Sequence, residues 1–530
     1  MALSTARFFL GFLPIVFLIY CAFPKSKRWL VLLSASYVFA WMASGSLALF
    51  MVATTVVVYV GARALGALNQ QAQRQADGET REERKARKEK LNKRKRIVVS
   101  VCVLAALGIL IGLKYGAFLG GMLDALRAAL SLPSLFGTAS SVALPLGISF
   151  YTLMAISYLV DVYRGKYPAC KNFGTVALYV SFFPQLNEGP FGRFDAMGRQ
   201  LRAGLVAHGP QLAYAVQLIA WGLFKKLVVA DRLNPLVGEL FTNHASYSGV
   251  MVALAAVLYT IQLYADFSGV IDIARGSAQL FGVSLESNFR QPFFSASVNE
   301  FWRRWHITLG SWLRDYVFYP VSLSRPVKKI ARWSRKRLPK HAAVLLTSLF
   351  SLLAVWLTCG IWHGAAWKYV AYGLYYFAIV FAGMLFEPLF KRFFSRTGID
   401  RAGKGFHRFA VARTCVLVCV GMLMFRADNL SVFASMMASL FTGPGIEPLL
   451  NGSWLSHGTD ALDLGVVAVS VAIMFFVGRS RERGTSFRAV MSERGFWRSC
   501  AVFCALCCAT LVFGAYGAGY VAVPSIYAGF

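Results

Sequence analysis

The chain has 530 residues, of which 57% belong to the hydrophobic set AVILMFWYC and only 15% are charged. Soluble domains are roughly 45–50% apolar and about 25% charged, so this composition excludes a disordered chain, a collagen and a small disulfide scaffold. The 55 Lys and Arg residues outnumber the 24 Asp and Glu residues and give a formal charge of +31. A nucleic-acid-binding protein would gather such charge on one surface.

The positive charge is instead concentrated in four short blocks. Arg81–Arg96 carries a net +7, Arg325–Lys340 +8, Lys391–Arg413 +6 and Arg479–Arg498 +4, which account for +25 of the +31. Apolar stretches separate the blocks, and a membrane-spanning helix needs about 20 such residues. We therefore predict an all-α polytopic membrane protein that binds no nucleic acid. The blocks then act as cytoplasmic topology signals that also contact anionic membrane lipids.

Twelve apolar stretches are each predicted to be a membrane-spanning helix. In order they are Phe8–Phe23, Trp29–Ala43, Ser46–Leu65, Ile97–Leu119, Leu144–Tyr163, Leu212–Ala230, Val250–Phe267, Ala343–Trp362, Trp367–Phe386, Val411–Phe425, Leu464–Val477 and Cys500–Val521. Several are shorter than about 18 residues, so we expect tilted, re-entrant or broken helices among them. Phe173–Phe191 and Val270–Phe281 are interrupted by Pro, Gly or charged residues, and each is predicted to insert only partly.

The chain is predicted to form a single integral membrane domain over residues 1–530. Residues 1–140 supply the N-terminal spans and a basic cytoplasmic loop at 70–96, residues 141–390 form a core that carries the motifs, and residues 391–530 supply the C-terminal spans. The block Arg81–Arg96 also suits a helix, because Glu82, Glu83 and Glu89 lie among its bases. We nevertheless expect a solvated loop there and no site.

Loops rich in Lys and Arg set the orientation, because they stay on the cytoplasmic side. With the four basic blocks inside, the segments Gly120–Ser141 and Asp428–Asp463, the turn Trp362–Trp367 and the C-terminus are predicted to lie outside. The first apolar stretch has no small-residue cleavage site, so we expect no cleavable signal peptide.

Cysteine and histidine positions limit the possible chemistry. Most of the ten cysteines lie in apolar spans, and Cys504-x-x-Cys507 has no second pair and no nearby His, so no metal or redox site is predicted. Five of the seven histidines fall in loops or charged segments, where no chemical role is expected: His208, His244, His341, His407 and His457. The other two, His306 and His363, have aromatic surroundings and are site candidates, because membrane chains keep few ionisable groups at depth.

The segment Asn299–Pro320 predicts an amphipathic helix that is too polar to span the membrane. Its apolar side chains share an arc of roughly 120° on a helical wheel; they are Trp302, Trp305, Leu309, Trp312, Leu313 and Tyr316. His306 lies at one edge of this arc near Arg303, and Asp315 lies opposite. We expect the helix to lie along the interface or to plug a helical bundle. Its role is either structural or the bracing of a charged ligand headgroup by tryptophans and arginines.

His363 lies where the chain turns between two predicted spans, in the segment CGIWHGAAWKYVAYGLYYF. The small residues Gly360 and Gly364 let a substrate or a neighbouring helix approach closely, and Trp362 and Trp367 are placed to wall a cavity. A neutral imidazole, with a pKa normally about 6.5, can take a proton from a hydroxyl and return it to a leaving group. A histidine that only packs between helices fits the same pattern, so the residues leave both interpretations open.

Several segments, taken in order, resemble the membrane-bound O-acyltransferase family. They are LPLGISFYTLMAISYLVDVYRG at Leu144–Gly165, FFPQLNEGP at Phe182–Pro190, GLFKKLVVADRL at Gly222–Leu233, LYADFSGVIDIARG at Leu263–Gly276, the run Asn288–Pro320, Trp362-His363-Gly364, and FRAD at Phe425–Asp428. Within this family the chain is most similar to bacterial alginate O-acetyltransferase membrane subunits, and more distantly to teichoic acid D-alanyl-transfer proteins. The resemblance implies a multi-helical bundle with re-entrant and interfacial helices around a central channel.

The resemblance also implies an activity. A bacterial cytoplasmic-membrane enzyme of this kind moves an acyl group, here acetyl, from a cytoplasmic thioester to hydroxyls of an exported or cell-surface polysaccharide. The donor is acyl-CoA or an acylated carrier protein, no cofactor is tightly bound, and a separate outer-face esterase-like partner is expected. The family's two motif histidines match His363 and His306, both predicted to be catalytic residues, with His363 as the base. Predicted substrate contacts are Asn288, Trp302, Arg303, Trp305, Asp315, Trp362 and Trp367.

Three departures from the family pattern concern the acceptor rather than the reaction class. Tyr319-Pro320 leads into a basic block instead of a glycine-rich turn. Tyr372-Gly373 and Tyr376-Phe377 stand where relatives have Trp-Gly and His-Gly. Phe191 stands where relatives have an aliphatic residue. Alternative functions are D-alanyl transfer to teichoic acid, transport of a lipid-linked precursor, and a non-catalytic envelope scaffold. The intact His363 motif and the lack of an internal inverted repeat favour the acyltransferase.

Overall fold

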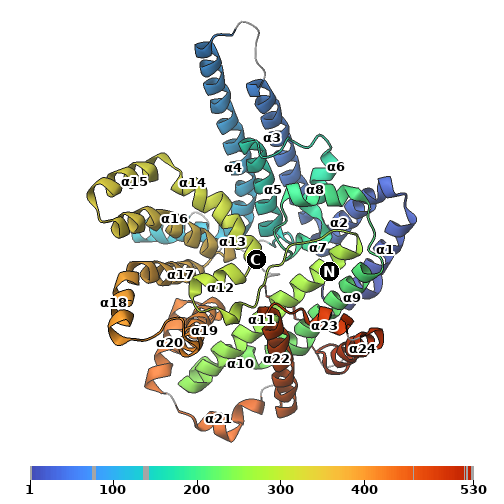
Figure 1. Ribbon diagram of the computed structural model, residues 1–530, viewed down its shortest axis with the longest axis vertical. Helices are drawn as coiled ribbons and strands as arrows, with labels where there is room; N and C mark the ends of the chain where they lie inside the picture. Colours follow the sequence, from blue (N-terminus) through green and yellow to red (C-terminus); the bar gives the residue numbers. More distant parts are fainter. Residues whose placement is uncertain are drawn as a thin grey trace. The chain divides into compact units, whose positions relative to one another are not determined.

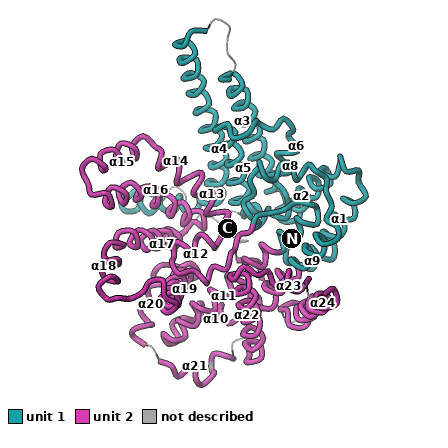
Figure 2. The backbone as a smooth tube through the Cα atoms, viewed as in Figure 1, with its two compact units in different colours: residues 1–219, 273–286, 527–530 teal, residues 220–272, 287–526 magenta. Residues whose placement is uncertain are grey.

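The computed structural model describes residues 3–73, 79–134, 143–443, 445–456, 459–493, 495–517, 520 and 523–526. His457, for which no chemical role is expected, lies outside these ranges, as does part of the predicted outer segment Gly120–Ser141. Within the described ranges the regular secondary structure is helical, which confirms the predicted all-α class. The residues form two compact units, one from 1–219 and 273–286 and one from 220–272 and 287–526 (Figure 2).

The first unit contains the helices of the first 203 residues (Figure 1). They are η1 (Arg7–Phe12), α1 (Leu13–Ala22), η2 (Lys25–Lys27), α2 (Arg28–Ser44), η3 (Gly45–Ala48), α3 (Leu49–Gln73), α4 (Arg81–Ala129), α5 (Ile148–Arg164), α6 (Phe173–Ser181), α7 (Phe183–Leu186) and α8 (Phe194–Ala203). Two further helices, α9 (Pro210–Leu223) and α11 (Gly249–Leu280), contribute residues to both units.

The second unit contains most of the remaining helices. They are η4 (Phe224–Ala230), α10 (Asp231–Thr242), η5 (His244–Ser246), η6 (Pro292–Phe294), α12 (Val298–Arg304), α13 (Ile307–Leu313), η7 (Arg314–Phe318), α14 (Tyr319–Ser322), α15 (Arg325–Arg337), α16 (Lys340–His363), α17 (Trp367–Leu385), α18 (Glu387–Thr397), α19 (Lys404–Arg426), α20 (Leu430–Thr442), α21 (Glu447–Asn451), η8 (Ser453–Ser456), α22 (Ala461–Glu482), α23 (Phe487–Glu493) and α24 (Phe496–Phe513).

Among the described residues, nine helices are long and apolar enough to cross a membrane. They are Lys25–Gln73, Arg81–Ala129, Pro210–Thr242, Gly249–Leu280, Lys340–His363, Trp367–Leu385, Lys404–Arg426, Ala461–Glu482 and Phe496–Phe513. The first of these holds two predicted spans, α2 and α3, which Gly45 separates at a φ of 55°. Shorter helices, α1 and the 17-residue α5, occupy two other predicted spans.

The structure corrects three sequence boundaries. Most of the predicted loop at 70–96 is helical, because α3 reaches Gln73 and α4 begins at Arg81 after a capping box between Thr80 and Glu83. Val270–Phe281 is no separate partial insertion, since α11 runs unbroken to Leu280. The last predicted span, Cys500–Val521, ends early because α24 stops at Phe513. The predicted division of the domain at residues 140 and 390 stays a prediction.

Buried ion pairs explain how α11 continues through its charged residues. The Lys226 ammonium lies 2.7 Å from carboxylate oxygens of both Asp231 and Asp266, and Lys225 lies 2.8 Å from Asp272. Charged groups are tolerated inside a membrane bundle when they pair with one another. Lys225 of η4 therefore neutralises Asp272, a carboxylate of the segment that was predicted to insert only partly. Lys226 neutralises Asp266 in the preceding predicted span.

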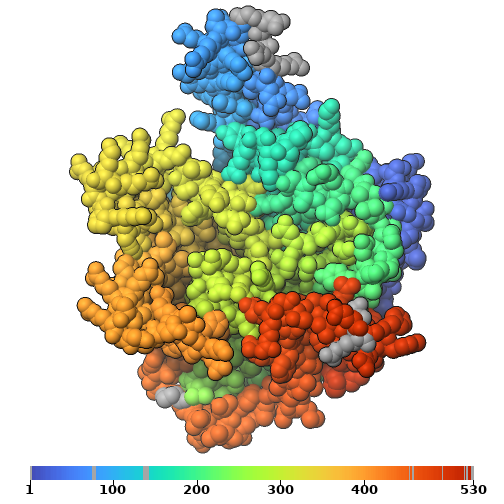
Figure 3. All heavy atoms as spheres, in the orientation of Figure 1, coloured from blue at the N-terminus to red at the C-terminus, as the bar shows by residue number. Residues whose placement is uncertain are grey.

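Helix α15 has the composition of an interfacial helix. Its buried residues are Val327, Ala331 and Ser334, whereas all seven of its Lys and Arg side chains are exposed. The yellow side chains of this segment reach the surface of the second unit in the space-filling view (Figure 3). This arrangement suits the headgroup region of a bilayer, where an amphipathic helix keeps its cations in water.

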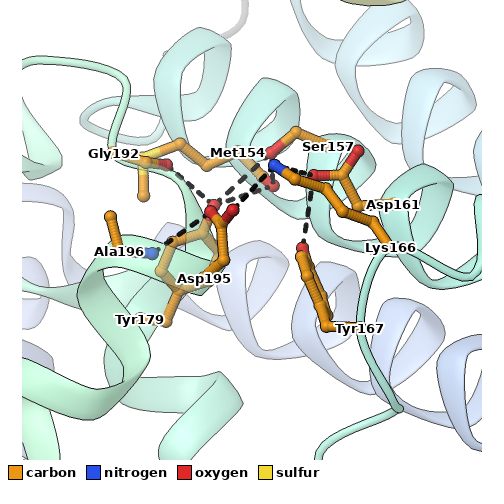
Figure 4. Close-up of polar contacts among 9 residues, drawn as sticks. All are labelled: Met154, Ser157, Asp161, Lys166, Tyr167, Tyr179, Gly192, Asp195 and Ala196. Atoms are coloured by element: carbon orange, nitrogen blue, oxygen red, sulfur yellow. Dashed lines mark hydrogen bonds and ion pairs between the residues drawn. The ribbon is translucent and has the colours of Figure 1, made fainter.

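A polar cluster fastens α8 to the end of α5 in the first unit (Figure 4). The Lys166 ammonium lies 2.7 Å from Asp195 and 3.5 Å from Asp161, and the Tyr167 hydroxyl donates to Asp161 over 3.4 Å. Partial burial raises the pKa of Asp195, but the hydrogen bond from Lys166 and its positive charge together lower the pKa by more. The pKa of Asp195 is therefore below its usual value. The ion pair thus favours the folded state only while Asp195 is ionised.

We expect Asp195→Asn to lower stability slightly, by about 0.5 kcal/mol at pH 7, because both side chains are substantially exposed. A carboxylate with a lowered folded pKa stabilises the fold above its unfolded pKa of about 4 and loses that effect as pH falls through the folded value. Thermal unfolding of the purified protein and the variant should therefore differ at pH 7 and converge in acid. An unchanged difference at low pH would contradict an ionic role.

Candidate active site

The predicted helix over Asn299–Pro320 is broken at Trp305 and His306. Helix α12 ends at Arg304, His306 adopts the left-handed conformation with φ 47° and ψ 51°, and α13 begins at Ile307. The prediction of one continuous amphipathic stripe is therefore wrong. Side chains before and after the break do not share the single face that a helical wheel assigns to them.

Asn288 is the main cause of this break. Its backbone oxygen accepts a hydrogen bond from the Ile307 N–H at 3.0 Å, and its side-chain Oδ1 accepts from the Thr308 N–H at 3.0 Å and the Thr308 hydroxyl at 2.6 Å. Two residues after Asn288, the Arg290 N–H donates to the Arg304 oxygen at 2.9 Å, and Phe289 and Trp305 form an isolated antiparallel bridge. These bonds satisfy backbone groups that a continuous helix would have paired internally.

His306 is buried against aromatic rings. It is 2% exposed, its ring centroid lies 4.8 Å from that of Phe267, and it lies 5.9 Å from that of Trp362. Burial lowers the pKa of His306 to about 3, so the imidazole is neutral at physiological pH. A neutral ring can accept and donate hydrogen bonds, but it supplies no positive charge to a ligand.

His363 is the last residue of α16 and is equally buried, at 2% exposed. Its ring centroid lies 4.9 Å from Trp362, 5.1 Å from Phe425 and 5.8 Å from Tyr372. Its Nε2 atom lies 3.9 Å from the Cys359 sulfur, one helical turn earlier. Trp362 contacts both histidine rings, so the structure brings the two candidate histidines into one aromatic cluster.

The glycines near His363 allow α16 and α17 to pack closely. A Cβ atom on Gly360 would collide with the backbone oxygen of Tyr369, and one on Gly373 would collide with the backbone oxygen of Trp356. Small residues at such contacts are typical of tightly packed membrane helices. This contact holds the end of α16, and with it His363, against the start of α17.

Of the predicted tryptophan contacts, Trp362 touches both histidine rings, and Trp302 reaches the tyrosine rings beside His363. Trp302 packs with Tyr376 at 4.8 Å between centroids and with Tyr372 at 6.4 Å, and Tyr372 in turn touches His363. Trp305 instead packs with Phe289 and Phe301, at 5.0 and 5.4 Å. Trp362 is 5% exposed but Trp367 is 55% exposed, so these two do not share one buried wall.

The polar candidates are more scattered. Arg303 is exposed, and Asp315 lies 3.4 Å from the exposed Arg314 side chain. Arg304, which sequence reasoning did not select, pairs instead with Glu300 at 2.6 Å and with Glu482 at 2.7 Å. Asn288 has a side chain that hydrogen-bonds to Thr308, two residues after His306.

Sequence reasoning missed the rings that surround the histidines. Phe267, Phe425 and Tyr372 were not selected, although Phe267 and Phe425 lie within segments that resemble the family. Aromatic residues are common in apolar helices, so their type alone gave no signal. Among the described residues, no group of three His, Cys, Asp or Glu side chains is arranged to hold a metal ion.

Comparison with known proteins identifies the family. The membrane-bound O-acyltransferase family model matches residues 171–333. The chain is 32% identical to the "Probable alginate O-acetylase AlgI" of Azotobacter vinelandii, over 90% of this chain and 84% of the relative. It is 32% identical to a "Peptidoglycan O-acetyltransferase" of Helicobacter pylori, over 44% of this chain and 46% of that relative.

A more distant relative is a "Teichoic acid D-alanyltransferase" of Bacillus subtilis, 25% identical over 47% of this chain and 61% of the relative. The sequence motifs, the apolar helices and the match to the alginate O-acetylase over most of the chain all indicate the same family. The chain belongs to the membrane-bound O-acyltransferase family and is a multi-pass O-acyltransferase of the bacterial inner membrane.

Proposed function

We propose that this enzyme transfers an acetyl group from a cytoplasmic thioester, acetyl-CoA or an acetylated carrier protein, to hydroxyls of an exported or cell-surface polysaccharide. Transfer is direct or passes through an outer-face esterase-like partner. The observation that carries the proposal is that His306 and His363 lie in one buried aromatic cluster, each in contact with Trp362. The names of the alginate and peptidoglycan relatives support a polysaccharide acceptor.

His363 is the proposed general base. A neutral ring nitrogen takes the proton of the acceptor hydroxyl as its oxygen attacks the thioester carbonyl carbon. The tetrahedral intermediate then collapses, the carbon–sulfur bond breaks, and the proton passes from His363 to the leaving thiolate. The surrounding rings of Trp362, Tyr372 and Phe425 exclude water, which would otherwise compete as the acceptor.

Helix α16 is long enough to place His363 on the opposite side of the membrane from the cytoplasmic acyl donor. The helix has 24 residues, about 36 Å at 1.5 Å per residue, and it starts directly after the basic helix α15. If the Arg325–Lys340 block is cytoplasmic, His363 lies toward the outer face, where the acceptor arrives. The donor's acyl group must then travel from the cytoplasmic side outward through the bundle to meet His363.

The experiment that tests the function compares ester-linked acyl groups on purified envelope and secreted polymers with and without the gene. We expect O-acetyl groups to disappear from one polysaccharide in the deletion strain and to return on complementation. Recovery of alanyl rather than acetyl esters would instead support the teichoic acid alternative. Unchanged esters on every polymer would contradict both.

The contact between Cys359 and His363 raises a second chemical route, in which the thiol carries the acyl group before transfer. We expect Cys359→Ala to keep ester formation within about threefold of wild type, because a thiol 3.9 Å away is a weak hydrogen-bond partner that only steadies the ring. The rate of ester formation per amount of membrane protein measures this. Complete loss of ester formation would instead favour an acyl-cysteine intermediate.

A further inference from the structure

The carboxamide of Asn288 has an orientation that its partners fix. Its Oδ1 atom accepts hydrogen bonds from the Thr308 main-chain N–H at 3.0 Å and the Thr308 hydroxyl at 2.6 Å. A main-chain N–H only donates, so the amide atom that faces it must be oxygen. The usual ambiguity between the oxygen and nitrogen of an Asn side chain therefore does not arise here.

The other end of this amide is a buried donor. Asn288 is 0% exposed, and its Nδ2 atom has no hydrogen-bond acceptor among the residues that the structure describes. Buried polar groups are nearly always hydrogen-bonded, because a donor removed from water without a partner is costly. An N–H group that the fold orients and buries in this way is suited to an oxygen atom of a bound ligand.

The position of this donor connects it to the proposed chemistry. Asn288 hydrogen-bonds to Ile307 and Thr308, the two residues that follow His306 directly. His306 contacts Trp362, which in turn contacts His363. The donor is thus fastened to the chain segment that forms one wall of the histidine cluster.

We propose that the Asn288 Nδ2–H group donates a hydrogen bond to the acyl oxygen of the transferring group. The inference rests on the proposed function. When the acceptor oxygen attacks, the carbonyl double bond opens and its oxygen becomes an anion, which the amide N–H stabilises. When the carbon–sulfur bond breaks, the carbonyl re-forms and the negative charge leaves with the thiolate, which takes the proton from His363. A rigid, preorganised donor stabilises this oxyanion more than the neutral carbonyl and so accelerates the step.

Asn288→Asp provides the test, because the carboxylate keeps an oxygen for the Thr308 N–H and removes the amide donor. The Thr308 N–H and hydroxyl can both donate to a carboxylate oxygen, so the contact to α13 is kept, and thermal unfolding of the purified variant measures any cost of burying the charge. We expect the rate of ester formation in cells, pulse-labelled with radioactive acetate and normalised to the amount of membrane protein, to fall about 100-fold. If the buried carboxylate prevents accumulation, Asn288→Ser tests the loss of the amide with a shorter, uncharged side chain.

Thr308→Val is the matched structural control. It removes the 2.6 Å hydroxyl contact to the same Oδ1 atom but leaves the amide donor in place. We expect a lower unfolding temperature and a rate per folded protein near that of wild type. Near-wild-type ester formation in Asn288→Asp would overturn the proposal and leave Asn288 as a helix cap only.

Measuring ester formation in His363→Ala alongside Asn288→Asp distinguishes a failure of this inference from a failure of the proposed function. Full ester formation in His363→Ala means that the proposed function itself has failed. Loss of activity in His363→Ala together with normal activity in Asn288→Asp means that only the role of the amide has failed.

Discussion

Replacing His363 with alanine is expected to lower ester formation on the surface polysaccharide about 1,000-fold while the protein still accumulates in the membrane. The imidazole is the proposed base for the acceptor hydroxyl. Loss of general acid–base catalysis typically lowers the reaction rate by roughly 10²–10⁴-fold, and the expected effect lies in that range. Its ring packs between Trp362, Phe425 and Tyr372, so alanine also leaves a small cavity. Quantitative release of acyl esters by mild alkali, normalised to protein, measures the loss.

Two companion variants separate chemistry from packing. His363→Phe refills the aromatic cluster without a titratable nitrogen and should be as inactive as His363→Ala. His341→Ala removes a histidine near the other end of the same helix and should leave ester formation intact. Recovery of activity in His363→Phe would assign His363 a packing role and remove the main support for the proposed mechanism.

Local sequence information was sufficient for the membrane helices. Length and hydropathy decide whether a helix can cross a bilayer, and both are properties of a contiguous segment. Every predicted span therefore contains a helix of the structure, and the small residues Gly360 and Gly373 indeed allow two helices to touch. The errors lie at helix ends and interruptions, where partners distant in sequence decide the outcome.

Two of these interruptions show why such partners are hard to infer. The charged residues of Val270–Phe281, among them Asp272, suggested that this segment inserts only partly, but Lys225 of η4 neutralises Asp272, and no local sequence pattern predicts that pairing. Conversely, periodicity predicted an unbroken helix through His306, but Asn288 caps Thr308 and ends it. In both cases a hydrogen bond or ion pair between separate segments overrides the local preference.

The break also changes which tryptophans belong to the site. On an unbroken helix Trp302 and Trp305 would face one ligand together. With the break, Trp302 reaches the rings beside His363, while Trp305 packs with Phe289 and Phe301. The backbone at His306, rather than the helical period, therefore decides which aromatic side chains can meet a substrate.

That backbone makes the substitution of His306 informative. His306→Asn is expected to lower ester formation about 100-fold, because it removes the neutral imidazole beside Trp362. Asn tolerates the left-handed conformation that His306 adopts at φ 47°, and glycine adopts it freely, so His306→Asn and His306→Gly both keep the break between α12 and α13. His306→Ala adds a conformational cost of about 1–2 kcal/mol, and should unfold at a lower temperature than the other two.

Equal losses of activity in all three variants would identify the ring as the functional element. Activity that follows the unfolding temperature instead would show that His306 serves only to shape the chain around Asn288.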